Sequence, residues 1–356
     1  MDDSLRSEIR ALQKVGGSLA LYLPKEWCEA NNLSKGSKVN LRYTTNFICL
    51  DVDVPDKSKS LAIDTSSLLE GELKYVLISL YILGYDRVKF LSNRRISLPL
   101  RRYITSSLRY TPDFKISDEG DNFITIKRIG EGEELIKSLT REFASVSTVF
   151  RYALEALESD KDLWYYHDAV EELDTEVDRA RVEVERTAYK LTERPYSNPA
   201  KLRYIIPSVI ISKLLERLAD HIALLISELE NSDKELRKNV SQTLKELENT
   251  YEELKKIFGE YYLRRGPLGV DDIAPIISKL VYIIENKKAF REASIKSFHE
   301  LSNELLVHHI IRIYRIYDYI TDIAEVLINV LLDSLNLLKS ESIYLNIYLF
   351  WCSVGS

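Results

Sequence analysis

The stretch KVGGSLALYLPKEW, residues 14–27, decides the fold of the N-terminal part of the chain. Leu19, Leu21 and Leu23 recur at every second position, which is the period of a strand with one buried face. The glycine pair before this run permits a tight reversal of the chain. The proline after it suits the first turn of a helix, which we expect to extend from Lys25 to Asn31.

Three further strands are expected around this stretch. One precedes the glycine pair, with Arg10, Leu12 and Lys14 on one of its faces. The segments LSKGSKVNLRY (residues 33–43) and FICLDV (residues 47–52) contain the other two, and a Lys-Gly turn at residues 35–36 lies near the start of the first segment. About fifty residues therefore form four short strands and one short helix. A segment of this size buries too little apolar surface to be stable alone, so we expect it to dimerise.

In this order and spacing, residues 6–54 closely resemble the AbrB/SpoVT swapped-hairpin domain. In that family two chains interleave into one small β-barrel, and the dimer usually binds DNA. The resemblance implies that residues 1–54 are a dimerisation and DNA-binding domain. Seven basic and three acidic residues lie between residues 6 and 50, a positive balance compatible with DNA binding. The expected phosphate contacts are Arg6, Arg10, Lys14 and Lys25.

Residues 55–130 predict a small α/β module. Strand-like and helix-like segments alternate, and a closing hairpin is indicated by FKIS and FITIKRI around the turn DEGD. Five arginines could contact phosphate groups or the acidic helical part of the chain, or could form a solvated surface. They are Arg94, Arg95, Arg101, Arg102 and Arg109.

Residues 131–340 are helical by periodicity. Their breaks delimit six helices of about 25 to 35 residues, which suggests two three-helix bundles in tandem. An apolar tail, residues 341–356, is too short to span a membrane, and we expect it to pack against the bundle or a dimer partner. The predicted fold class is therefore multidomain: an N-terminal swapped-hairpin β-barrel, a small α/β module and a C-terminal all-α part.

Two acidic pairs mark the first helical repeat. Asp174 and Asp178 lie four residues apart, as do Glu216 and Asp220, so each pair shares one helix face. Like charges at this spacing repel, and a bound cation would offset the repulsion. Such oxygen ligands suit hard cations or iron. The alternative is that both pairs are solvated, or neutralised by neighbouring arginines.

The segments ELDTEVDRA and LERLADHIA, within residues 135–340, resemble the PhoU phosphate-signalling family. That family repeats a three-helix bundle twice and carries an E/D-x-x-x-D motif, which holds iron or zinc in some members. The four carboxylates match this motif, and His167 and His221 could add an imidazole. The second repeat keeps Asp318, but Tyr314 replaces the acid four residues earlier. We therefore expect at most one metal site, for iron or zinc, and no organic cofactor.

The leading hypothesis is a DNA-binding regulator of phosphate uptake that senses its signal through the PhoU-like part. The alternative is an adaptor that binds a phosphate transporter ATPase or a sensor kinase, with the N-terminal domain serving only to form a homodimer. No CxxC, Walker, GxSxG or HExxH motif occurs, so we expect no enzyme. No signal peptide is recognisable, and no apolar run is long enough to span a bilayer, which predicts a cytoplasmic protein without membrane insertion.

Overall fold

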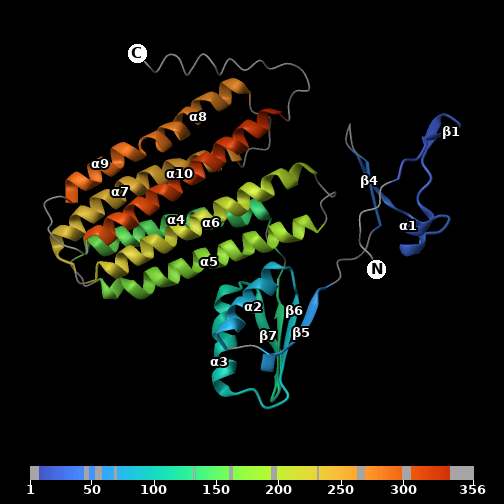
Figure 1. The fold of residues 1–356 in the computed structure, drawn as a ribbon, viewed down its shortest axis with the longest axis horizontal. Coiled ribbons are helices and arrows are strands. Elements are labelled where there is room, and N and C mark those ends of the chain that lie inside the picture. The colour runs from blue at the N-terminus through green and yellow to red at the C-terminus, as the bar shows by residue number, and fades with distance from the viewer. Residues whose placement is uncertain are drawn as a thin grey trace. The chain divides into compact units, whose positions relative to one another are not determined.

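The computed structural model describes eleven parts of the chain, which fall into two compact units, Met1–Lys57 and Ser58–Ser356 (Figure 1). The parts are residues 8–43, 48–52, 58–67, 70–130, 132, 134–159, 163–193, 199–230, 232–262, 269–298 and 306–336. Arg6 and the tail 341–356 lie outside the described residues. The predicted fold class is confirmed, and the domain boundaries expected within Ser58–Ser356 stay predictions.

The N-terminal unit, called the head below, consists of two hairpins and a short helix. Its elements are β1 (Gln13–Val15), β2 (Ser18–Ala20), α1 (Lys25–Ala30), β3 (Asn40–Tyr43) and β4 (Ile48–Asp51). Gly16 adopts a φ of 60° in the turn between β1 and β2, so the glycine pair supplies a left-handed turn that most residues disfavour. The described residues form two separate two-stranded sheets and no closed barrel.

The middle module is a four-stranded mixed sheet with two helices on one face. Its elements are β5 (Ser60–Asp64), α2 (Glu70–Ile82), β6 (Arg87–Leu91), α3 (Leu98–Ser107), β7 (Phe114–Gly120) and β8 (Phe123–Arg128). The strand order is β5-β6-β8-β7, and β5 and β6 run parallel. Apolar residues of α2 and α3 pack with Val88, Phe90 and Ile124 of the sheet, so both helices cover the same face (Figure 1).

The helical body contains seven α-helices in the described residues, where the sequence predicted six. They are α4 (Leu135–Glu158), α5 (Trp164–Thr192), α6 (Pro199–Glu228), α7 (Lys234–Ile257), α8 (Val270–Glu285), α9 (Lys287–Phe298) and α10 (Leu306–Asn336). The extra helix arises because the fifth predicted helix is interrupted at Asn286, which caps α8. A short π-helical segment, η3 (Phe258–Tyr262), extends α7.

The two helical repeats share one hydrophobic core. A continuous cluster of buried side chains extends from Leu139 of α4 through Leu218 of α6 and Leu244 of α7 to Ile320 of α10. Helix α6 packs against α4 and α5 of its own repeat and against α10 of the second repeat. The repeats are therefore fused side by side, as Figure 1 shows, and do not form independent bundles.

A buried arginine joins the helical body to the middle module. Arg186 of α5 is 1% exposed and donates hydrogen bonds to the backbone carbonyls of Tyr81 and Tyr85. It also forms an ion pair of 2.8 Å with the carboxylate of Asp86. The carbonyl groups at the C-terminal end of a helix lack partners within the helix, so the guanidinium of Arg186 satisfies the end of α2.

The same interface contains a second series of polar contacts. The hydroxyl of Tyr81 donates a hydrogen bond to the buried carboxylate of Glu183, which lies 3.6 Å from Arg128. Arg128 in turn pairs with Asp113 at 3.0 Å. Val182 of α5 completes the apolar cluster under the sheet. Buried charges are tolerated only when paired, so these contacts hold the module against α5 in one arrangement.

We expect Arg186→Met to lower the free energy of unfolding by about 3 kcal/mol, because it leaves Asp86 and the end of α2 without their buried partner. Chemical denaturation followed by circular dichroism measures this loss. The matched control is Arg179→Met on the same helix, where the arginine's one ion pair in the described part of the chain is with Glu176, one turn away. The control should change stability by less than about 0.5 kcal/mol. Equal losses in both variants would contradict the role given to Arg186.

Candidate functional site

The packing of α5 against α6 brings the four predicted carboxylates into one group, the acidic cluster: Asp174, Asp178, Glu216 and Asp220. The helices run antiparallel, so that Asp174 interacts with Asp220 and Asp178 with Glu216. Glu216 is buried and the three aspartates are partly buried. Residues that are 46 and 38 positions apart in sequence therefore face one another across two helices.

Burial and mutual repulsion shift the protonation of the acidic cluster. Burial, followed by the charges of Asp220 and Asp178, raises the pKa of Asp174 to about 7. Burial, followed by the charge of Glu216, raises the pKa of Asp220 to about 6. Burial also raises the pKa of Asp178. The cluster thus holds negative charge in a place where it is poorly solvated.

Cations neutralise only one half of the acidic cluster. Lys213 lies 2.7 Å from Glu216, and the guanidinium of Arg181 lies 3.7 Å from Glu216 and 3.8 Å from Asp178. Among the described residues, neither Asp174 nor Asp220 has a cationic group within 4.0 Å. The neutralisation expected as the alternative therefore applies to Asp178 and Glu216 and leaves Asp174 and Asp220 unpaired.

The acidic cluster fits a hard cation or iron by its chemistry. One carboxylate oxygen of Glu216, Oε2, is buried and has no hydrogen-bond partner, although the Nε of Arg217 lies 3.6 Å from it. Among the described residues, no cationic group lies within 4.0 Å of Asp174 or Asp220. Carboxylate oxygens are the donors that such metals prefer. In the described part of the chain, the ligand atoms that already lie within 4.8 Å of one another belong to a different set: His167, Asp168 and Glu171. Asp168 and Glu171 of that set are solvent-exposed.

The two histidines do not complete the acidic cluster. His221 faces α10, where its Nδ1 lies 3.3 Å from Arg312 and its Nε2 lies 3.5 Å from the hydroxyl of Tyr319. Burial and the charge of Arg312 lower the pKa of His221 to about 4. His167 lies beside Asp168, with its Nδ1 3.7 Å from that carboxylate. Neither imidazole is placed as the sequence suggested.

The second repeat neutralises its remaining acid. Asp318 pairs with Lys287 at 2.9 Å and with Arg291 at 2.8 Å. Tyr314, which stands where the motif has an acid, donates its hydroxyl hydrogen bond to the backbone carbonyl of Arg291. Lys287 and Arg291 therefore already supply Asp318 with the positive charge that a bound metal would otherwise provide.

A buried acid on α4 escaped the sequence analysis. Glu142 is fully buried, and Ser212 of α6 donates a hydrogen bond of 2.5 Å to it. Burial raises the pKa of Glu142 well above its usual range. The signal was present, because Glu142 lies on the apolar face that also carries Leu139 and Phe143. A carboxylate on that face must be buried with a partner.

The predicted phosphate contacts of the head differ in how far their charged groups are already paired. Arg10 lies before β1, not in a strand, and pairs with Glu8 at 2.6 Å while donating to the carbonyl of Tyr22. Lys14 and Lys25 are exposed, and Lys25 has only a loose pair with Glu29 at 3.6 Å. Lys14 and Lys25 are therefore freer than Arg10 to meet an anion.

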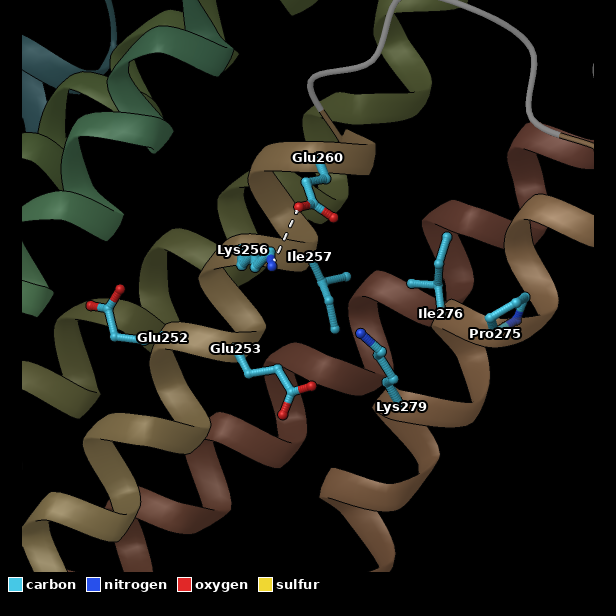
Figure 2. A pocket seen from close by; sticks show the side chains of 8 residues that line it. All are labelled: Glu252, Glu253, Lys256, Ile257, Glu260, Pro275, Ile276 and Lys279. Carbon is cyan, nitrogen blue, oxygen red and sulfur yellow. Dashed lines mark ion pairs between the residues drawn. The ribbon is translucent and has the colours of Figure 1, made fainter.

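A surface pocket of about 400 Å³ lies between α7 and α8, away from the acidic cluster (Figure 2). Its charged lining consists of three glutamates and two lysines: Glu252, Glu253, Glu260, Lys256 and Lys279. Lys256 pairs with Glu260 at 3.8 Å. The lining thus carries one more negative than positive charge, which is too small an excess to indicate a cation site.

The fold and the site define a modular protein, with a hairpin head, a sheet module and a fused helical double repeat that holds an acidic cluster. Residues 139–228 match the family model of the PhoU domain. Residues 12–58 match the model described as "Antidote-toxin recognition MazE, bacterial antitoxin". Both resemblances are therefore confirmed over the residues that the two models match.

The PhoU match covers most of the first helical repeat, which contains the acidic cluster. It supports a role in regulating phosphate homeostasis, and the N-terminal match is compatible with DNA binding. Both matched families are regulatory and non-enzymatic. A search of curated proteins finds no match to the chain. None of the described helices combines the length and apolar character that crossing a bilayer requires.

The raised pKa values predict a pH-dependent cost of folding. Between about pH 4 and 7, the folded protein holds protons on Asp174 and Asp220 that the unfolded chain has released, so these groups contribute less stability as the pH rises. Asp174→Asn removes the charge. With a chelator present, we expect it to raise the free energy of unfolding by about 2 kcal/mol at pH 7.5 and to leave it unchanged at pH 4.

Denaturation curves at the two pH values test this expectation. Glu172→Gln is the matched control, because Glu172 lies on the same helix but is exposed to solvent. The control should have the stability of the wild type at both pH values. If Asp174→Asn raised the free energy of unfolding equally at pH 4 and pH 7.5, the charged form of Asp174 would not be destabilising.

Proposed function

We propose that this protein is a dimeric, DNA-binding regulator of phosphate uptake, whose head binds DNA and whose PhoU domain senses the signal. One observation carries the proposal: the head has strand-like apolar alternation, yet none of its described residues is buried. The combination of a MazE/AbrB-type domain and a PhoU domain in one chain supports the pairing of these two roles.

The head exposes the side chains that would form a core. Leu12, Val15, Leu19 and Leu41 are each more than half exposed, and Leu19 reaches 68%. Contiguous exposed apolar surface is unfavourable in water and marks a site of association. A second copy of the head, interleaved as in the swapped-hairpin family, would cover these side chains and place two sets of basic residues on one surface.

In this proposal Lys14 and Lys25 make the main phosphate contacts of the head. Arg10 contributes only if it leaves Glu8, and Arg6 lies outside the described residues. Phosphate contacts of this kind provide affinity and register, whereas sequence preference requires contacts with base edges.

The acidic cluster is proposed as the single metal site, with Asp174, Asp178, Glu216 and Asp220 as the residues that would hold iron or zinc. A bound cation would supply the positive charge that Asp174 and Asp220 lack. It would thereby remove the repulsion between α5 and α6. The packing of these two helices then depends on occupancy, which is the property that a sensing domain requires.

A second candidate function is the adaptor, which would bind a phosphate transporter ATPase or a sensor kinase without binding DNA. It is favoured by the state of Arg10, because that guanidinium is already occupied by Glu8 and by the carbonyl of Tyr22. In this case the head would serve only for dimerisation.

DNA binding distinguishes the two candidates. We expect the full-length protein to bind promoter DNA of its own phosphate-transport genes more tightly than a scrambled duplex, as measured by fluorescence anisotropy over a salt series. Lys14→Gln with Lys25→Gln should reduce the slope of log affinity against log salt by about 1.8, which corresponds to two lost phosphate contacts. Lys35→Gln with Lys38→Gln, at two other exposed lysines of the head, is the control for charge. Absence of specific binding by the wild type would favour the adaptor.

Metal content tests the acidic cluster. We expect Asp174→Ala with Asp220→Ala to lose bound iron or zinc, measured by elemental analysis after dialysis, while circular dichroism retains the helical signal. The matched control is Asp168→Ala with Glu171→Ala in the exposed set one to two turns earlier on α5. Wild-type metal content in the first variant, or loss in the control alone, would assign the site elsewhere.

A further inference from the structure

The middle module leaves one face of its sheet open. Helices α2 and α3 both pack on the face that carries Val88, Phe90, Ile124 and Ile126. The side chains at alternate positions of the strands point to the opposite face, as the pleat requires. Figure 1 shows both helices on the same side of the sheet, so the opposite face lacks a helical cover from this module.

The strand register places basic residues side by side on the open face. Arg87 of β6 is paired with Lys127 of β8, and Lys127 is paired with Lys115 of β7. These three exposed side chains form a row across three strands, called the basic row below. Lys89 lies two residues beyond Arg87 on the same face, opposite Thr125.

The basic row is unfavourable without a counter-charge. Residues directly opposite on neighbouring antiparallel strands have Cβ atoms about 5 Å apart, and like charges at this distance repel. Among the described residues, no carboxylate lies within 4.0 Å of the charged groups of Arg87, Lys115 or Lys127. Asp118, the nearest acid in the register, is paired with Thr125 in the next row. An external anion would therefore stabilise the arrangement.

We propose that the open face of the middle module binds the phosphate backbone of duplex DNA through Arg87, Lys115, Lys127 and Lys89. Neutralising phosphates with lysine and arginine releases condensed counterions, and this supplies affinity without any apolar anchor. The occupant is a polyanion because the sheet presents several cations in line, whereas one small anion would meet only one or two of them.

The composition of the face favours a duplex over other acidic partners. Protein interfaces are built around apolar or aromatic anchors, and single-stranded nucleic acid requires exposed rings on which bases stack. The aromatic ring on this face belongs to Phe123, which is only partly exposed and lies under the ammonium group of Lys89 at 4.6 Å. A backbone contact that ignores sequence suits such a surface best.

The experiment measures binding of the full-length chain to a scrambled 30-base-pair duplex over a salt series. The test variant is Arg87→Gln with Lys115→Gln and Lys127→Gln. Three lost phosphate contacts should reduce the salt slope by about 2.7 and weaken binding at low salt by about tenfold or more. Because the substitutions remove mutual repulsion, the variant should be at least as stable to heat as the wild type, which separates lost binding from lost folding.

The matched control removes the same charge from the helical body: Lys234→Gln with Lys238→Gln and Lys245→Gln, at exposed positions of α7. An unchanged slope in the test variant, or an equal fall in the control, would overturn the proposal. Tighter binding to single-stranded DNA or RNA of the same length would overturn the duplex as occupant.

The proposal does not require the head to bind DNA, and the Lys14→Gln, Lys25→Gln variant keeps the two separate. A loss confined to the test variant supports the open face and removes the head from DNA binding. A loss confined to the head variant does the reverse. Losses in both, adding in the combined variant, support two DNA contacts on one chain, joined by an effective concentration that the linker sets.

Discussion

Helix α5 forms buried polar contacts with α6 on one side and with the middle module on another, and the arrangement of the Ser58–Ser356 unit depends on these contacts. Arg181 and Glu185 lie one turn apart and face α6, whereas Glu183 and Arg186 face the middle module. Because both sets are paired across tertiary contacts, α5 cannot shift against α6 without disturbing the buried hydrogen bonds of Arg186. A change in the charge of the acidic cluster therefore acts on a helix that also packs against α2 of the middle module.

The head differs from the helical body. Its turns are specified by local sequence, but the burial of its apolar side chains is not. Gly16 and Gly36, both at positive φ, fix the turns within one chain. The apolar side chains that the alternation places on one face stay exposed among the described residues. Local sequence thus determines the hairpins, while in the proposed dimer the hydrophobic contribution that stabilises them comes from a second copy.

Sequence reasoning succeeded where the signal is local or periodic. It found the hairpin at Gly16, the end of α2 near Gly84, and the carboxylates that meet across α5 and α6. It missed the interruption at Asn286, because the apolar period continues through that residue. It also missed the basic row, because Arg87 and Lys115 come to lie on either side of Lys127 only through the strand order β5-β6-β8-β7, which no local pattern encodes.

The two helical repeats provide an internal comparison for the unpaired charges. In the second repeat, Asp318 is neutralised by Lys287 and Arg291, so the fold can surround an acid at this position with cations. In the first repeat, no described cationic group lies within 4.0 Å of Asp174 or Asp220, although burial and mutual repulsion oppose their charged form. Since an intramolecular solution is available to this architecture, the unneutralised acids of the first repeat support the proposal that a cation from outside the chain binds there. The basic row is the opposite case: its positive charges face solvent on an otherwise well-packed module, and in the proposal an external anion offsets them.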